Sequence, residues 1–112
     1  MKKIAIFDPA RTTTSVDMWN LLEKALILRG HEVLRDIPAD ADVILVDIED
    51  INYRPQWESA LRLHAPNAII IGLVPCENVY IGLDGSIIIP HEEIAFAIEQ
   101  MVMTLTQDSH AL

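Results

Sequence analysis

The stretch Asp42-Val43-Ile44-Leu45-Val46-Asp47-Ile48-Glu49-Asp50 is an apolar run that ends in a cluster of acidic residues. The run is short, rich in β-branched residues and free of polar alternation, which is typical of a strand buried on both faces in a parallel sheet. In open α/β sheets, ligands bind beyond the carboxyl ends of such strands. Asp47 is therefore a candidate functional residue, and the alternative is an acid that only caps the next turn.

The composition is typical of one compact domain. The chain has 112 residues, of which 51% are hydrophobic and 22% are charged. This is enough for an ordinary core but not for a second module. We expect the domain to span residues 1–106 and a polar tail to span residues 107–112.

The charge and the cysteine content argue against several classes of function. Seventeen acidic residues against eight Lys and Arg give a net charge of -9, which repels nucleic acids and anionic membranes. The single Cys76 cannot form an internal disulfide and fits a reducing compartment. No apolar run in the sequence is long enough to span a bilayer. We therefore expect a cytoplasmic protein that binds neither nucleic acid nor membranes.

Four more apolar runs predict strands, and apolar residues at helical spacing predict helices between them. The predicted strands cover residues 3–7, 31–35, 42–47, 68–74 and 86–89. The first predicted helix begins at Thr14 or Ser15 and ends at Gly30, the second covers residues 56–63, and the last begins at Pro90. This alternation predicts a three-layer α/β fold, with a five-stranded parallel sheet in the flavodoxin-like order 2-1-3-4-5.

Two connections between the predicted strands are shorter than this fold normally needs. Residues 36–41 contain Pro38 and no helical pattern, although a parallel crossover usually carries a helix. Residues 75–85 are interrupted by Gly82 and by the turn signal Asp84-Gly85. The second and fourth crossovers are therefore predicted to be shortened, and one face of the sheet to be left partly bare.

Apolar residues outside the predicted core stripes mark a possible interface. The stripe of the first helix is predicted to consist of Met18, Leu21, Leu22, Ala25 and Leu28, and that of the last helix of Ile94, Ala97, Ile98, Met101 and Leu105. Trp19, Leu26 and Ile27 lie outside the first stripe, and Phe96 and Met103 lie opposite the second. We expect Trp19, Ile27, Phe96 and Met103 to contact another protein. For the residues of the first helix, the alternative is that another element of the fold covers them.

Several segments resemble the receiver domain of response regulators. Residues 42–47, 56–63 and 66–74 resemble the middle of that domain. Residues 82–90, followed by residues 94–98, are similar to its last strand and last helix. The resemblance implies a place in a two-component system of signal transduction.

The resemblance also assigns roles to four positions. Asp47 matches the aspartate that receivers phosphorylate, and Asp8 matches an acid that helps to hold their magnesium ion. Val74 stands where receivers have a hydroxyl residue, and Ile89 stands where they have a lysine. Without the lysine no cation pairs with the phosphoryl oxygens, and without the hydroxyl the phosphate-dependent switch has no hydrogen bond to make.

The resemblance therefore implies a degenerate receiver, or pseudo-receiver. We expect a non-catalytic module that acts by binding a protein partner, a second copy of the chain, or both. We expect neither productive phosphorylation nor a cofactor, although Asp8 and Asp47 could still hold magnesium weakly.

A small-ligand protein is the alternative. Residues 8–15 form a Thr-rich loop of the length that cradles phosphate in flavodoxins and in the sugar-phosphotransferase B domains, so a flavin or a phosphate-containing ligand could bind at the strand ends. The loop lacks the glycines that let backbone amides approach a phosphate. This favours the interaction module over the ligand-binding protein.

Overall fold

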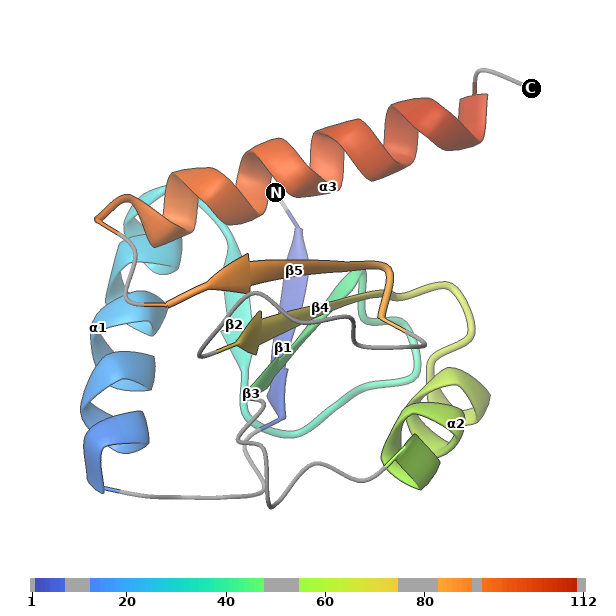
Figure 1. Ribbon diagram of the computed structural model, residues 1–112, viewed down its shortest axis with the longest axis horizontal. Helices are drawn as coiled ribbons and strands as arrows, with labels where there is room; N and C mark the ends of the chain where they lie inside the picture. The colour runs from blue at the N-terminus through green and yellow to red at the C-terminus, as the bar shows by residue number, and fades with distance from the viewer. Residues whose placement is uncertain (1, 8–12, 48–54, 75–82, 90–91, 111–112) are drawn as a thin grey trace.

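The computed structural model describes residues 2–7, 13–47, 55–74, 83–89 and 92–110, with backbone only at residues 13–18, 47, 55–57 and 107–110 (Figure 1). Strands and helices alternate along the chain. They are β1 (Lys3–Phe7), α1 (Thr13–Leu28), β2 (Glu32–Leu34), β3 (Val43–Asp47), α2 (Pro55–His64), β4 (Ile69–Val74), β5 (Gly85–Ile88) and α3 (Ile94–His110).

The five strands form one parallel sheet in the order β2-β1-β3-β4-β5. This confirms the predicted α/β class and strand order, which are those of a flavodoxin-like fold. The central strand is β3, where Ile44 pairs with Ala5 of β1 and with Ile70 of β4. The apolar run that includes residues 43–46 is buried on both faces, as its lack of alternation predicts.

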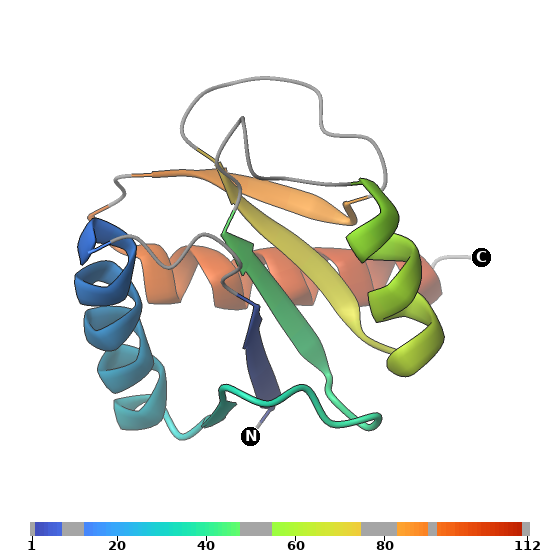
Figure 2. The ribbon, with the colours of Figure 1, turned by 90° about the horizontal axis from the view of Figure 1, so that it is seen from below.

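Helices cover both faces of this sheet. α1 and α3 lie on one face and α2 lies on the other (Figures 1 and 2). Successive residues of β3 alternate between the two cores: Val43 and Leu45 pack with α1 and α3, and Ile44 and Val46 pack on the α2 side. The architecture therefore has three layers, with two separate hydrophobic cores.

The buried face of α1 differs from the predicted stripe. Trp19 and Leu26 are fully buried, whereas Leu21 and Leu28 are 71% and 88% exposed. Of the described residues in the predicted stripe, Leu22 is buried and Ala25 packs against the same core, as expected. The assignment of Trp19 to a partner interface is therefore wrong. α1 carries apolar residues all around, and the orientation that places the large indole in the core removes the most apolar surface from water.

The α2 face of the sheet is not bare, so the prediction of an under-covered sheet is wrong. The second crossover has no helix, as predicted: residues 35–42 form bends, a turn and irregular backbone. Ile37 and Ala41 of this segment nevertheless pack against the α2-side core. The carbonyl oxygen of Ile37 lies 2.5 Å from Nε2 of His64, which links the crossover to α2. Residues 75–82 of the fourth crossover lie outside the described part of the chain.

Two aspartates extend the strand pairing at the start of β3 and of β5. The N–H of Asp42 donates to the Lys3 carbonyl at 2.9 Å, and its Oδ2 accepts from the Lys3 N–H at 2.8 Å. Asp84 makes the same pair of bonds with Ile70, both at 2.8 Å. The two carboxylates accept hydrogen bonds from the N–H groups of Lys3 and Ile70. Without these bonds, the two backbone donors would have no partner in the sheet.

The last helix, α3, begins later and ends later than predicted. It begins at Ile94, not at Pro90, and continues to His110, so residues 107–110 of the expected polar tail are helical. α3 lies so close to β5 that Gly85 has no room for a side chain beside Met101. A Cβ added there would lie 2.5 Å from the Met101 sulfur. This close approach places the side of α3 that carries Met101 against the edge strand of the sheet.

Candidate functional site

The carboxyl ends of the strands carry the residues that the receiver resemblance assigns to chemistry. The backbone of Asp47 ends β3 and pairs with Leu73 of β4. Its side chain, Asp8 and residues 9–12 of the predicted phosphate loop lie outside the described residues. The magnesium site, the phospho-acceptor role and the ligand-binding alternative therefore stay predictions. Within the described residues, no three His, Cys, Asp or Glu side chains form a group that could hold a metal ion.

Val74 and Ile89 lie next to each other at this edge of the sheet. Val74 ends β4 and is buried, and its carbonyl oxygen accepts a 2.9 Å hydrogen bond from the N–H of Ile89. Ile89 is partly buried and packs against the core formed with α1 and α3. Val74 belongs to the α2-side core, so the two side chains pack on opposite faces of the sheet. Their assignment to the hydroxyl and lysine positions of a receiver stays a prediction.

α3 forms a ridge between two grooves. Phe96 and Gln100 line both grooves and so lie on the crest of the ridge. Phe96 and Met103 are 46% and 52% exposed, as predicted from their helical spacing, and Ile27 of α1 is 52% exposed as well. The structure therefore keeps three of the four predicted interface residues on the surface.

The first groove lies between α3 and β5, and we call it the β5 groove. Its volume is about 550 Å³. Ala97, Met101 and Leu105 contribute its apolar lining, and Asp84 and Glu93 contribute carboxylates. The groove therefore combines an apolar surface with acidic groups.

The second groove lies at the amino-terminal end of the strands, and we call it the amino-end pocket. Its volume is about 320 Å³. The apolar part of the lining comes from core residues at the starts of β1 and β3 and from α3, namely Ile4, Val43, Ile98 and Val102. Lys2, Arg29, His31 and Glu99 contribute its polar part.

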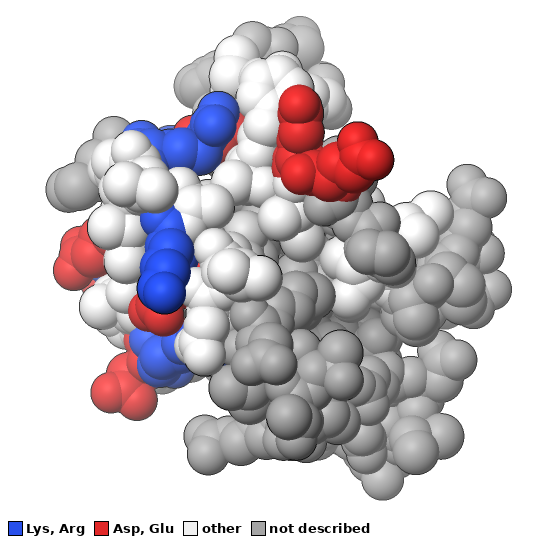
Figure 3. Space-filling view, turned by 90° about the vertical axis from the view of Figure 1, so that its left-hand side faces the viewer, with Lys and Arg blue, Asp and Glu red and all other residues white. Residues whose placement is uncertain are grey.

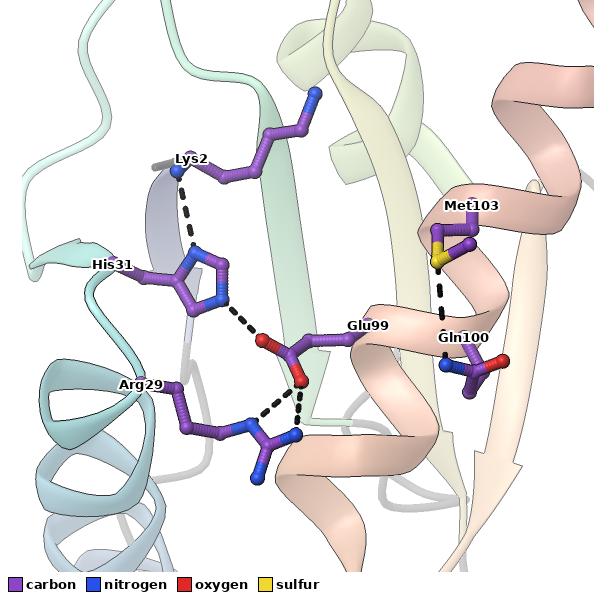
Figure 4. A network of polar contacts seen from close by, with 6 residues as sticks. All are labelled: Lys2, Arg29, His31, Glu99, Gln100 and Met103. Atoms are coloured by element: carbon purple, nitrogen blue, oxygen red, sulfur yellow. Dashed lines mark hydrogen bonds and ion pairs between the residues drawn. The ribbon is translucent and has the colours of Figure 1, made fainter.

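The polar part of the amino-end pocket is a connected network (Figure 4). Oε1 of Glu99 accepts from Nε of Arg29 and contacts its Nη2, both at 2.5 Å. Oε2 of Glu99 lies 2.7 Å from Nε2 of His31, and the N–H of Lys2 donates to Nδ1 of His31 at 3.2 Å. Because Nδ1 accepts this bond, the hydrogen-bond pattern assigns the ring proton to Nε2, which donates to Glu99.

The network fixes the charge of Glu99 and ties α3 to the end of α1. The hydrogen bond from Arg29, followed by that from His31, holds the pKa of the Glu99 carboxyl below its usual value. The Arg29 guanidinium also lies 5.9 Å from the centre of the Phe96 ring, within the range of a cation–π contact. The sequence gives no signal for this network, because Glu99 lies 70 residues from Arg29 and 68 from His31.

Basic residues on the α1 side of the molecule have acidic neighbours. Figure 3 shows Lys and Arg side chains spread over the described part of this face, with Asp and Glu beside several of them. Arg35 lies 3.4 Å from Glu23, and Lys3 at the start of β1 lies 2.7 Å from Asp40. Such pairs offset part of the positive charge of the described residues.

None of the helices within the described ranges has the length and apolar content needed to cross a membrane. Comparisons of the chain with protein-family models, with curated proteins and with solved structures found no match. The resemblance to receivers therefore rests on the quoted segments and on the strand order alone.

Proposed function

We propose that this protein is a non-catalytic, receiver-like module of cytoplasmic signal transduction, which acts by binding another protein through α3. The observation that carries the proposal is the pair of exposed apolar side chains, Phe96 and Met103, on a helix flanked by two apolar grooves. Large apolar side chains gathered on one surface favour a protein contact more than scattered ones do.

The strand ends support the non-catalytic part of the proposal. The backbones of Val74 and Ile89 are joined by a hydrogen bond at the carboxyl ends of the strands, and the resemblance to receivers assigns the hydroxyl and the lysine to these two positions. Neither side chain can pair with a phosphoryl oxygen. A carboxylate at Asp47 alone would lack the cation that stabilises phosphoryl transfer.

The outer side of α3 supports the interaction part. Phe96 contacts the Arg29 guanidinium and borders both grooves, so a partner that covers it would also reach apolar lining on either side. Aromatic side chains placed centrally in an apolar patch commonly supply a large share of binding energy. A second copy of this chain is the partner that the proposal tests first.

The proposal predicts that acetyl phosphate and magnesium leave the protein unmodified. The physical reason is the absence of a cation or a hydroxyl at positions 74 and 89. Intact-mass spectrometry and fluorescence of the purified protein measure the outcome, with Asp47→Asn as the matched control. A saturable, magnesium-dependent change in the wild type that disappears in Asp47→Asn would contradict the proposal.

The proposal also predicts self-association at micromolar concentration, measured by light scattering. Phe96→Asp should raise the dissociation constant at least about tenfold, because burial of one aromatic side chain contributes roughly 1.5–3 kcal/mol. Leu63→Asp is the control, since Leu63 is also exposed but lies on α2, on the other face of the sheet. A wild type that stays monomeric over the whole range, or an equal effect of Leu63→Asp, would count against α3 as the contact surface.

A further inference from the structure

The amino-end pocket has the size and lining of a small-molecule site. Its volume of about 320 Å³ falls within the range of pockets that hold small ligands, and its lining is mainly apolar with a few polar groups. The apolar lining belongs to the core: Ile4, Val43, Ile98 and Val102 are all buried. The pocket therefore has a rigid apolar wall, supplied by two strands and a helix.

The polar side of the pocket carries an excess of positive charge. Lys2 and Arg29 each contribute one positive charge and Glu99 contributes one negative charge, so the charges of the Lys, Arg and Glu side chains that line the pocket sum to a positive value. The Lys2 ammonium forms no ion pair with any of the described residues. In a chain with a net charge of -9, this local excess is unusual and attracts an anion.

The network also holds the Arg29 and His31 side chains in place before a ligand arrives. Glu99 fixes the Arg29 side chain through Nε and Nη2, and the guanidinium keeps further N–H donors for another acceptor. Figure 4 shows His31 between the backbone N–H of Lys2 and the carboxylate of Glu99, which in turn contacts Arg29. Polar groups that are already positioned lose less entropy when a ligand binds.

We propose that the amino-end pocket binds a small organic anion, with an aromatic or branched apolar body and one carboxylate or sulfonate group. The apolar body lies against Ile98 and Val102, and the anionic group pairs with the Lys2 ammonium. Met103 lies at the edge of the pocket, where its sulfur favours an aromatic ring. The site is at the opposite end of the strands from Asp47, and it does not depend on α3 acting as a protein contact.

Anilinonaphthalene sulfonate is a suitable probe, because it combines two aromatic groups with one anionic group and its fluorescence rises in an apolar site. Titration of the full chain should show saturable binding at one site. Lys2→Gln should weaken this binding about fivefold, as expected for one partly screened ion pair. Lys24→Gln, which removes an exposed lysine of α1 away from the pocket, should leave it unchanged.

N-phenylnaphthylamine has the same rings without the sulfonate and serves as the matched ligand control. Its binding should be weaker than that of the sulfonate, and Lys2→Gln should not change it. Equal affinity for both probes, or an equal effect of Lys2→Gln on both, would overturn the assignment of an anion site.

Two further variants locate the bound probe. Val102→Phe fills the amino-end pocket and should reduce binding at least about tenfold, whereas Thr104→Phe adds the same group to the β5 groove and should have no effect. Amide NMR spectra of the wild type provide a readout that needs no variant: the probe should shift the signals of Ile4 and Ile98. No saturable binding, loss of binding in Thr104→Phe, or shifts confined to the β5 groove would overturn the proposal.

Discussion

Replacing Trp19 by alanine should lower the free energy of unfolding by about 3–5 kcal/mol, the usual cost of removing a large aromatic side chain from a core. Trp19 is fully buried and belongs to the core that α1 shares with α3 and the sheet. Truncation therefore leaves a cavity between two helices and a strand layer. Urea unfolding followed by circular dichroism measures the change, because the midpoint should fall while the slope stays the same.

Leucines on the same helix provide matched controls for this prediction. Leu26→Ala, at a fully buried position, should cost about 2–5 kcal/mol, whereas Leu28→Ala, at a position 88% exposed, should change stability by less than about 0.5 kcal/mol. If Trp19→Ala and Leu28→Ala had equally small effects, the indole would lie on the surface, as the sequence pattern suggested.

Replacing Ile44 by alanine should lower the free energy of unfolding by about 2–5 kcal/mol. Ile44 is fully buried in the centre of β3 and faces the α2 side of the sheet, the side expected to be partly bare. A large loss of stability in Ile44→Ala would therefore show that α2 and the helix-free second crossover exclude water from this face. The same unfolding measurement applies.

Ile88→Ala is the control for Ile44→Ala, because it makes the same change in a strand where the side chain is 45% exposed. We expect it to cost less than half as much, since far less apolar surface is lost from the core. Similar costs at both positions would mean that the α2 face is open to water, in agreement with the sequence-based expectation and against the structure.

The sequence by itself determined the fold class and the order of the strands. The apolar runs that include residues 43–46 and 69–74 are buried on both faces, and such runs signal a central parallel strand whatever surrounds them. Gly30, at a φ of 90°, follows the end of α1 and adopts a conformation that favours glycine. The exposure of Phe96 and Met103 was also predictable, because a long amphipathic helix leaves the side opposite its apolar stripe to solvent.

Only the tertiary structure decided which side of α1 is buried and what covers the α2 face of the sheet. α1 offers two apolar stripes, one with Trp19 and Leu26 and the other with Leu21 and Leu28, and local spacing cannot choose between them. The choice depends on packing against α3 and the sheet. In the same way, the crossover of residues 35–42 shows no periodic pattern, yet it covers part of the sheet through Ile37 and its contact with α2.

The amino-end pocket also depends entirely on the tertiary structure. Arg29 and His31 follow α1, whereas Glu99 belongs to α3, and no local pattern links residues about 70 positions apart. Their contact arises because β1 is paired with both β2 and β3, and α3 returns across the amino-terminal ends of these strands. The physical reason is general: spacing along the chain reports local periodicity, but a charge network between distant elements exists only after the sheet and its helices have packed.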